Sequence, residues 1–147
     1  MTLVFAIGNP QRADDGVAVE VCRMVDPGAW TVIETMELTP EMAERASLAH
    51  RVIFVDADYR GGEPSVEALG AASCCPGPLT HSLRPCDLVL TARRLFGFCG
   101  EAWLLRVPGV EFGLGNPLSE TAKANAEVAA KLLEELLQRD PAAGNSD

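Results

Sequence analysis

The segment Thr2-Leu-Val-Phe-Ala-Ile7 is a short apolar run that ends in Gly8-Asn9-Pro10. A short apolar run that stops at turn-forming residues is typical of a buried strand. A second run of this kind, Arg51-Val-Ile-Phe-Val-Asp-Ala57, is the clearest buried strand in the sequence. Because strands buried on both faces occur mainly in parallel sheets covered by helices, the two segments predict an α/β protein.

The rest of the chain alternates between strand and helix patterns. We expect further strands at 30–36, 65–69 and 101–108. We expect helices from about Asp15 to Val25, from Thr39 to about Ala49, from Pro85 through Phe96, and from a cap within 116–119 to about Leu136. This order predicts a largely parallel sheet covered on both faces, within one domain at 1–139 and followed by a flexible tail at 140–147.

The charge of the chain argues against a nucleic-acid partner. The formal net charge is −9 at pH 7, whereas proteins that neutralise phosphates carry a basic surface. No apolar stretch approaches the roughly 20 residues that a membrane-spanning helix needs, so we expect no membrane partner. The first ten residues lack the basic start of a signal peptide, which predicts a cytoplasmic protein.

The five cysteines give no metal-binding pattern of their own. Their number is odd, and without a secretion signal reduced thiols are expected. A metal cluster can be drawn from Cys74, Cys75, His81 and Cys86, but its spacing matches no zinc pattern. Cys86 and Cys99 are expected to pack as small apolar side chains.

Carboxylates follow two of the predicted strands at their carboxyl ends. Asp14 and Asp15 follow the first strand, and Asp56 closes the strand at 51–57. In open parallel sheets the ligand crevice lies beyond these ends, and His81 is expected in a loop on the same side. Two carboxylates and one imidazole suit a borderline divalent metal such as nickel or zinc. The sequence lacks the His-Glu-x-x-His motif of common zinc peptidases.

Each of these residues also has a purely structural interpretation. Asp14 or Asp15 can cap the first helix, since a short carboxylate satisfies its free amides. Asp56 can accept hydrogen bonds from loop amides, and a loop histidine such as His81 or His50 is often only a surface or core residue. The residues alone leave these alternatives open.

Four motifs, in order, resemble those of one enzyme family, the maturation endopeptidases of [NiFe] hydrogenases. Residues 8–18, Gly-Asn-Pro-Gln-Arg-Ala-Asp-Asp-Gly-Val-Ala, resemble its first motif, and 52–57, Val-Ile-Phe-Val-Asp-Ala, its second. Thr80-His-Ser-Leu83 is similar to the third, and 110–119 to the segment before the terminal helix. The likeness spans residues 3 to about 137. At Leu38-Thr-Pro-Glu41 the chain departs from a Gly-Thr-x-Gly loop and is similar to the subgroup that serves cytoplasmic, NAD-linked hydrogenases.

The resemblance implies a three-layer α/β/α sandwich with a mostly parallel central sheet of about five strands. It implies an endopeptidase that removes the C-terminal extension of a nickel-loaded hydrogenase large-subunit precursor. Asp15, Asp56 and His81 would be the catalytic residues and would contact nickel supplied by the substrate, with Asp14 as a further possible base. No organic cofactor is implied.

Two other functions fit parts of the pattern. A non-catalytic, nickel-binding maturation chaperone could use the same scaffold. Peptidyl-tRNA hydrolases also begin with a strand and Gly-Asn-Pro, but they need an Asn/His constellation and a basic surface for tRNA. Carboxylates stand at 14 and 15 and the net charge is −9, so this second alternative is disfavoured.

Overall fold

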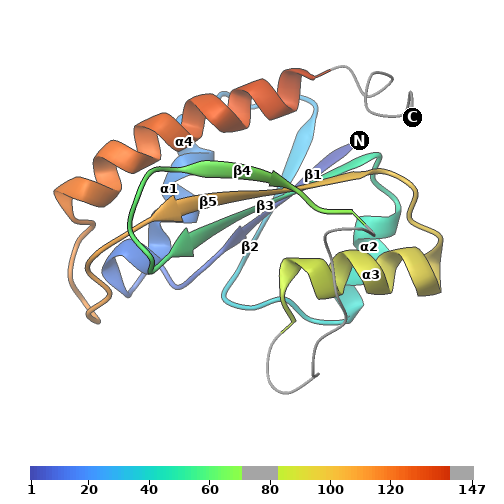
Figure 1. The fold of residues 1–147 in the computed structure, drawn as a ribbon, viewed down its shortest axis with the longest axis horizontal. Coiled ribbons are helices and arrows are strands. Elements are labelled where there is room, and N and C mark those ends of the chain that lie inside the picture. Colours follow the sequence, from blue (N-terminus) through green and yellow to red (C-terminus); the bar gives the residue numbers. More distant parts are fainter. Residues whose placement is uncertain (71–82, 140–147) are drawn as a thin grey trace.

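The computed structural model describes residues 1–70 and 83–139 (Figure 1). The strands are β1 (Thr2–Ile7), β2 (Trp30–Thr35), β3 (Arg51–Asp58), β4 (Ser65–Ala68) and β5 (Glu101–Pro108). The helices are the 3-10 turn η1 (Ala13–Gly16), α1 (Val17–Met24), α2 (Glu41–Ser47), α3 (Pro85–Phe96) and α4 (Glu120–Gln138). Each strand and helix expected from the sequence is present.

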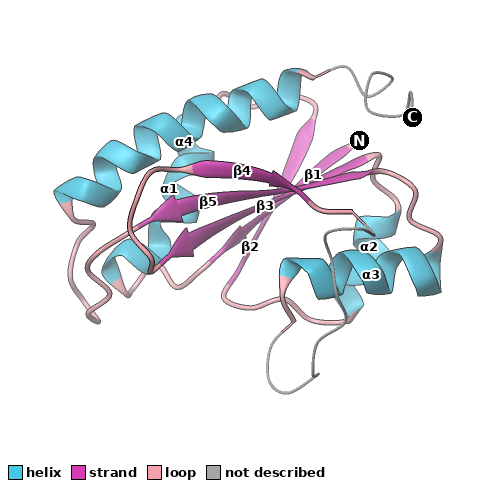
Figure 2. Cartoon of the chain, viewed as in Figure 1, coloured by secondary structure: helices cyan, strands magenta, loops and turns pink. Residues whose placement is uncertain are grey.

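The five strands form one sheet in the order β2-β1-β3-β5-β4. β1, β2, β3 and β5 are parallel, and only β4 runs antiparallel, beside β5. Helices α1 and α4 cover one face of the sheet, and α2 and α3 cover the other (Figure 2). The predicted three-layer α/β/α sandwich with a mostly parallel sheet is therefore confirmed.

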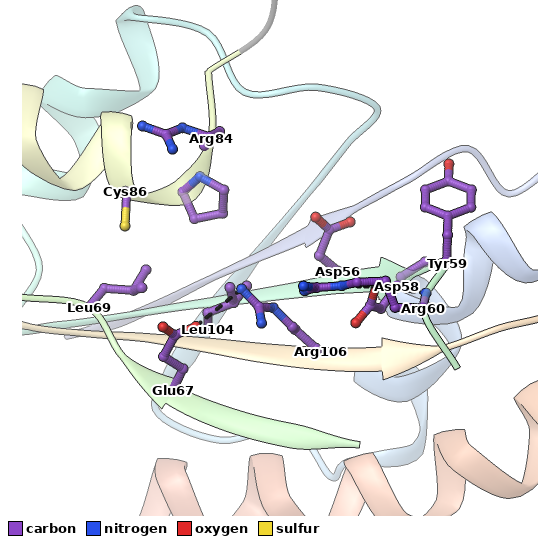
Figure 3. A pocket seen from close by; sticks show the side chains of 12 residues that line it. Asp56, Asp58, Tyr59, Arg60, Glu67, Leu69, Arg84, Cys86, Leu104 and Arg106 are labelled. Carbon is purple, nitrogen blue, oxygen red and sulfur yellow. Dashed lines mark hydrogen bonds and ion pairs between the residues drawn. The ribbon is translucent and has the colours of Figure 1, made fainter. Parts of the chain in front are cut away.

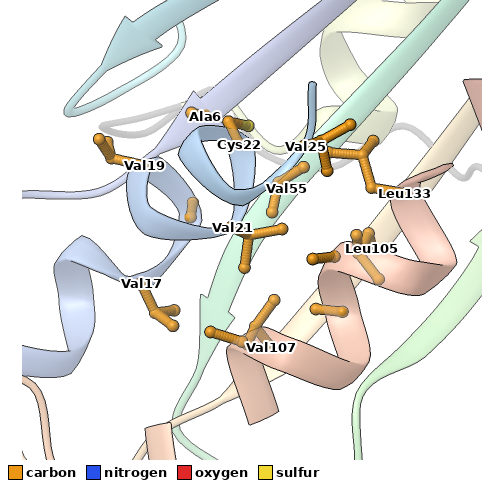
Figure 4. Packing of buried hydrophobic residues seen from close by; sticks show 14 of the residues in the cluster. Ala6, Val17, Val19, Val21, Cys22, Val25, Val55, Leu105, Val107 and Leu133 are labelled. Atoms are coloured by element: carbon orange, nitrogen blue, oxygen red, sulfur yellow. The ribbon is translucent and has the colours of Figure 1, made fainter. Parts of the chain in front are cut away.

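Alternate side chains of the strands enter two separate cores, as the pleat requires. Val4, Ile53 and Leu105 pack under α1 and α4, where aliphatic side chains interlock (Figure 4). Phe5 and Phe54 face α2 and α3, with ring centroids 5.3 Å apart. This alternation also assigns polar residues to a face, because even-numbered residues of β3 and β5 face the side of α2 and α3.

A buried ion pair fixes the far end of α4. The Arg51 side chain is 2% exposed, and its Nε lies 2.6 Å from Glu101 Oε1. It also donates to the carbonyl oxygens of Leu137 and Arg139, at 3.4 and 2.7 Å. These carbonyls belong to the last turn of α4 and the residue after it, where a cation opposes the negative end of the helix dipole.

The ends of two helices differ from the sequence prediction. Helix α1 ends at Met24, because Val25 is extended and precedes Asp-Pro-Gly, although its side chain still enters the core. Helix α2 starts at Glu41 with no side-chain cap, so the cap predicted at Thr39 is wrong. Ser119 does cap α4, since its hydroxyl accepts from the Ala122 amide at 3.0 Å.

The cysteines do not all behave as expected. Cys22 is buried and free, and burial followed by the nearby Glu34 carboxylate raises the pKa of its thiol to about 12. Cys99 is free but exposed, so it does not pack in a core. Cys86 is disulfide-bonded, which makes the expectation of reduced thiols wrong at that residue. Cys74 and Cys75 lie outside the described residues.

Two further expectations concern the C-terminal tail and membrane-spanning helices. The predicted tail at 140–147 lies outside the described residues. Within 1–70 and 83–139, no helix combines the length and the apolar character that crossing a membrane requires.

Candidate functional site

The site lies where the sheet reverses its order of strands. From β1 the chain passes through α1 to β2 on one side, and later returns through α2 to β3 on the other. Ile7, the last residue of β1, is in register with Asp56 of β3, and Asp15 follows β1 by eight residues. Such a reversal leaves a crevice beyond the carboxyl ends of the two strands, where ligands bind in open α/β sheets.

The loop after β1 holds the Asp15 side chain in place. The Asn9 amide donates to Asp15 Oδ2 at 2.8 Å. Gly8 has φ +144°, and a Cβ there would lie 1.8 Å from the Asp15 carbonyl oxygen, so only glycine allows this approach. Neither Asp14 nor Asp15 caps η1 or α1 through its side chain, so the interpretation of either as a cap of this first helix is wrong.

Asp14 has a different environment, although it is adjacent to Asp15. Its side chain is fully buried and accepts four hydrogen bonds. Oδ2 accepts from the amides of Val110 and Glu111, at 2.8 and 2.9 Å, and from the Ser119 hydroxyl at 2.6 Å. Oδ1 accepts from the Ser119 amide at 2.7 Å. Gly109 makes room, because a Cβ there would lie 2.6 Å from that of Asp14.

These bonds determine the charge state of Asp14. Burial alone would raise the pKa of the carboxyl group. The Ser119 hydroxyl and the amides of Glu111, Ser119 and Val110 outweigh burial, and the pKa lies below its usual value of 3.8. A carboxylate held ionised with four donors around it has little capacity to accept a further proton. The structure thus favours a structural role for Asp14 over the role of base considered from the sequence.

Asp56 has the opposite character. Burial is the largest cause and the negative charge of Asp15 the second, and together they raise the pKa of Asp56 to about 6. The Ala57 amide and Arg106 act against this rise. The repulsion means that the side chains of Asp15 and Asp56 lie near one another, as their positions after β1 and in β3 predict. The Asp56 carboxylate is ionised above pH 6.

A cavity of about 450 Å³ extends from Asp56 over β5 and β4, on the face of α2 and α3 (Figure 3). Asp56, Arg106 and Glu67 lie on its strand side, and Arg106 is 3.2 Å from Glu67. Leu69 and Leu104 add apolar surface, and Arg84, Pro85 and Cys86 line it at the start of α3. A cavity of this size can hold a peptide segment beside the carboxylate pair.

An exposed aromatic pair borders the same edge of the sheet. Tyr59 is 69% exposed, and its ring contacts that of Phe112 at a centroid distance of 4.3 Å. Partial burial, followed by the charges of Asp15 and Asp56, raises the pKa of the Tyr59 hydroxyl. The ring therefore lies close to both carboxylates.

The described residues contribute two of the three predicted ligands. His81 lies outside the described range, and so do Cys74 and Cys75 of the alternative cluster. Within 1–70 and 83–139, no three His, Cys, Asp or Glu side chains gather closely enough to hold a metal ion. The chain re-enters the described range at Leu83, which bridges Leu38 just before the cavity-lining turn of α3. His50 lies apart, beside the N-terminal amine.

Sequence reasoning did not identify Arg106, Glu67 or Tyr59 as site residues. Arg106 does carry a signal, because it is a charged residue at an even position of β5, where Ala102 and Leu104 are apolar and face α2 and α3. An arginine on a face that is otherwise core requires either a buried partner or an open cavity. Glu67 and Tyr59 lie in segments whose positions depend on how β4 and the loop after β3 fold back.

The structure was compared with known proteins. No protein-family model and no curated protein sequence matches the chain. The hydrogenase maturating endopeptidase HybD from E. coli superposes with a TM-score of 0.74 at 16% identity, covering 93% of this chain and 91% of that one. The hydrogenase maturation protease HycI from Thermococcus kodakarensis gives 0.65 at 24% identity, covering 94% and 92%. A hydrogenase 2 maturation peptidase from a Thaumarchaeota archaeon gives 0.66 at 21% identity, covering 95% and 99%.

The chain has the fold of the hydrogenase maturation proteases. These structures match it over nearly its whole length, and the expectation of this fold, drawn from four short motifs, is confirmed. The identities are 16–24%, so the comparison establishes the architecture.

Replacing Asp14 by asparagine should destabilise the protein. The substitution removes the buried charge while four donors still point at the side chain. We expect the free energy of unfolding, measured by urea denaturation, to fall by roughly 2–4 kcal/mol. The lowered pKa means that ionised Asp14 stabilises the fold above pH 3.8 and that this contribution is lost as pH falls through the folded-state pKa. The difference from wild type should shrink in acid. Asp26→Asn, at an exposed residue, is the control and should change the free energy by less than about 0.5 kcal/mol.

Replacing Asp56 by asparagine should stabilise the protein at pH 7.5. Its folded-state pKa of about 6 lies above 3.8, so ionised Asp56 weakens the fold above pH 6, and this cost disappears as both states become protonated below pH 4. The variant should gain on the order of 1–2 kcal/mol at pH 7.5 and little at pH 4. The same difference in stability between the variant and the wild type at both pH values would contradict the raised pKa of Asp56. In a ¹³C NMR titration, Asp15→Asn should lower the pKa of Asp56.

Proposed function

We propose that the protein is an endopeptidase that removes the C-terminal extension of a nickel-loaded [NiFe]-hydrogenase large-subunit precursor. The observation that carries the proposal is the electrostatically coupled pair Asp15 and Asp56 at the strand reversal, beside a cavity that fits a peptide. Its setting supports the proposal, because the chain has the fold of proteins named hydrogenase maturation proteases.

The carboxylate pair is suited to a metal that arrives with the substrate. Two nearby negative charges repel each other, and a divalent cation between them removes this repulsion. In the proposal Asp15, Asp56 and His81 contact nickel that substrate ligands already hold. Oxygen and imidazole ligands suit nickel, and three protein contacts leave positions for the ligands of the substrate. Since Asp56 is ionised above pH 6, the site is ready for a metal at neutral pH.

The same groups can serve hydrolysis of the neighbouring peptide bond. Nickel of the substrate can polarise the carbonyl group or lower the pKa of a water. Asp15 is the candidate base, because within the described residues its carboxylate accepts one hydrogen bond, from the Asn9 amide, and can still accept a proton. Asp14 is not proposed for this step, because four donors occupy it.

Recognition through nickel would make cleavage conditional on metal loading. The protein would not bind a precursor that lacks nickel at this site, since the carboxylate pair then has no cation to bind.

We further propose that the chain acts as a single domain over 1–139, in the cytoplasm, with the large-subunit precursor as its partner. The net charge of −9 favours a partner whose docking face is basic.

A cleavage assay tests the proposal directly. Purified protein is incubated with nickel-loaded and with nickel-free precursor, and the C-terminus is followed by intact mass spectrometry. Loss of the extension is expected from the loaded form alone. Equal cleavage of both forms would contradict recognition through nickel. Binding of the loaded precursor without any cleavage would instead support a nickel-binding chaperone.

Alanine variants of the three proposed ligands test the site. Asp15→Ala, Asp56→Ala and His81→Ala should each slow cleavage of loaded precursor by about a thousandfold or more, because each removes a contact to the metal next to the reacting bond. The thermal unfolding temperature of Asp15→Ala should change little, since the substitution removes one hydrogen bond, the one from the Asn9 amide. The matched control Asp26→Ala should cleave at the wild-type rate. If one of these three alanine variants keeps full activity, the replaced residue is not a nickel contact.

A further inference from the structure

Arg106 lies beside Asp56 on the neighbouring strand of the sheet. The two residues are in register on adjacent parallel strands, β5 and β3, and both face α2 and α3. Side chains paired in this way have Cβ atoms about 5 Å apart. The influence of Arg106 on the pKa of Asp56 agrees with this proximity. Figure 3 shows Arg106 on the β5 ribbon, beside Asp56 and within the cavity lining.

The surroundings of Arg106 differ from those of a structural arginine. Arg51 is buried in the same sheet, and Glu101 and two carbonyl oxygens surround its guanidinium. The Arg106 side chain is 36% exposed, and it forms an ion pair with Glu67, whose side chain is 46% exposed. An exposed pair of this kind contributes little to stability. It does, however, restrict the guanidinium to the cavity.

We propose that Arg106 is a catalytic residue of the cleavage reaction, donating N–H groups to the carbonyl oxygen of the scissile peptide bond and stabilising the negative charge that forms there. This inference rests on the proposed function and names a role that the carboxylate pair cannot fill. Asp15 and Asp56 are acceptors and cannot donate to an oxygen that gains negative charge, whereas the guanidinium of Arg106 can.

The reaction balances with water as the one co-reactant. The oxygen of water forms a bond to the carbonyl carbon, and the π electrons of the C=O bond move to its oxygen, beside Arg106. The proton of water passes to Asp15. When the C=O bond re-forms, the C–N bond breaks, and the nitrogen takes the electron pair and the proton. The products are a carboxylic acid, which ionises, and an amine. Arg106 remains protonated throughout.

Two other arginines line the cavity but fit this role less well. The Arg60 side chain is 72% exposed and is held at the rim by its own neighbour Asp58, which accepts from its Nε at 3.2 Å. Arg84 binds Asp87 through Nε and Nη2, at 3.1 and 3.0 Å, at the first turn of α3. Neither lies on the strand beside Asp56. Of the cavity arginines in the described residues, Arg106 is therefore the one placed by the sheet next to the proposed metal contact.

Single-turnover cleavage of nickel-loaded precursor by the full chain tests the proposal. Arg106→Gln should lower the rate constant by about 10²–10³-fold, the usual loss for one donor to such an oxygen. The dissociation constant for the precursor should change less than about threefold, because the donor acts on charge that forms during the reaction. Arg106→Lys keeps a cation and should recover part of the rate. Arg23→Gln removes an exposed pair with Glu34 and should cleave at the wild-type rate.

Glu67→Gln separates catalysis from a structural role. If Arg106 acts on the substrate, this variant keeps the guanidinium and should lose less than about tenfold in rate. If Arg106 only ties β4 to β5 through its ion pair with Glu67, Glu67→Gln and Arg106→Gln should lose the same in rate, and the proposal is overturned. Unchanged cleavage by Arg106→Gln also overturns it and leaves the proposed function intact. Failure of the wild-type protein to cleave loaded precursor would overturn both.

Discussion

The buried carboxylate of Asp14 connects three separate parts of the chain, and the geometry of the site depends on it. Its backbone lies in the loop after β1, and its oxygens bind the amides that follow β5 and the Ser119 cap of α4. The Asp14 amide in turn donates to the Glu111 carbonyl oxygen at 2.8 Å. Because Asp15 is the next residue, the network that orders these loops also places the Asp15 carboxylate at the crevice.

Two adjacent aspartates thus have opposite tasks, and their hydrogen bonds decide which is which. Asp14 is surrounded by donors, so its charge stabilises the fold. Among the described residues, Asp15 and Asp56 have few donors, and the two carboxylates repel each other. This repulsion weakens the folded protein, and it is the property that a site for an incoming cation requires. Stability and function are therefore divided between neighbouring residues.

The order of strands and helices could be predicted from the sequence, because apolar runs and helical periods reflect burial directly. The crevice followed from topology, since Asp15 lies in the segment after β1 and Asp56 lies near the carboxyl end of β3, the parallel strand beside it. The role of Asp14 could not be predicted, because its donors lie about 100 residues away along the chain. The missing Thr39 cap and the early end of α1 reflect local backbone geometry, to which composition is a weak guide. The exposed pair Arg106 and Glu67 depends on how β4 returns beside β5.

The two faces of the sheet explain why a cavity forms on one side. Helix α4 packs against β5 and α1 on its face and is fixed at both ends, by Asp14 through Ser119 and by Arg51 after its last turn. On the opposite face α3 starts at the cavity, and there the even-numbered residues of β3 and β5 change from apolar to charged, from Phe54 to Asp56 and from Leu104 to Arg106. A charged sheet surface without a complete helical cover stays open to solvent. The polar ends of β3 and β5 thus create the cavity and supply its acceptor and its donor together.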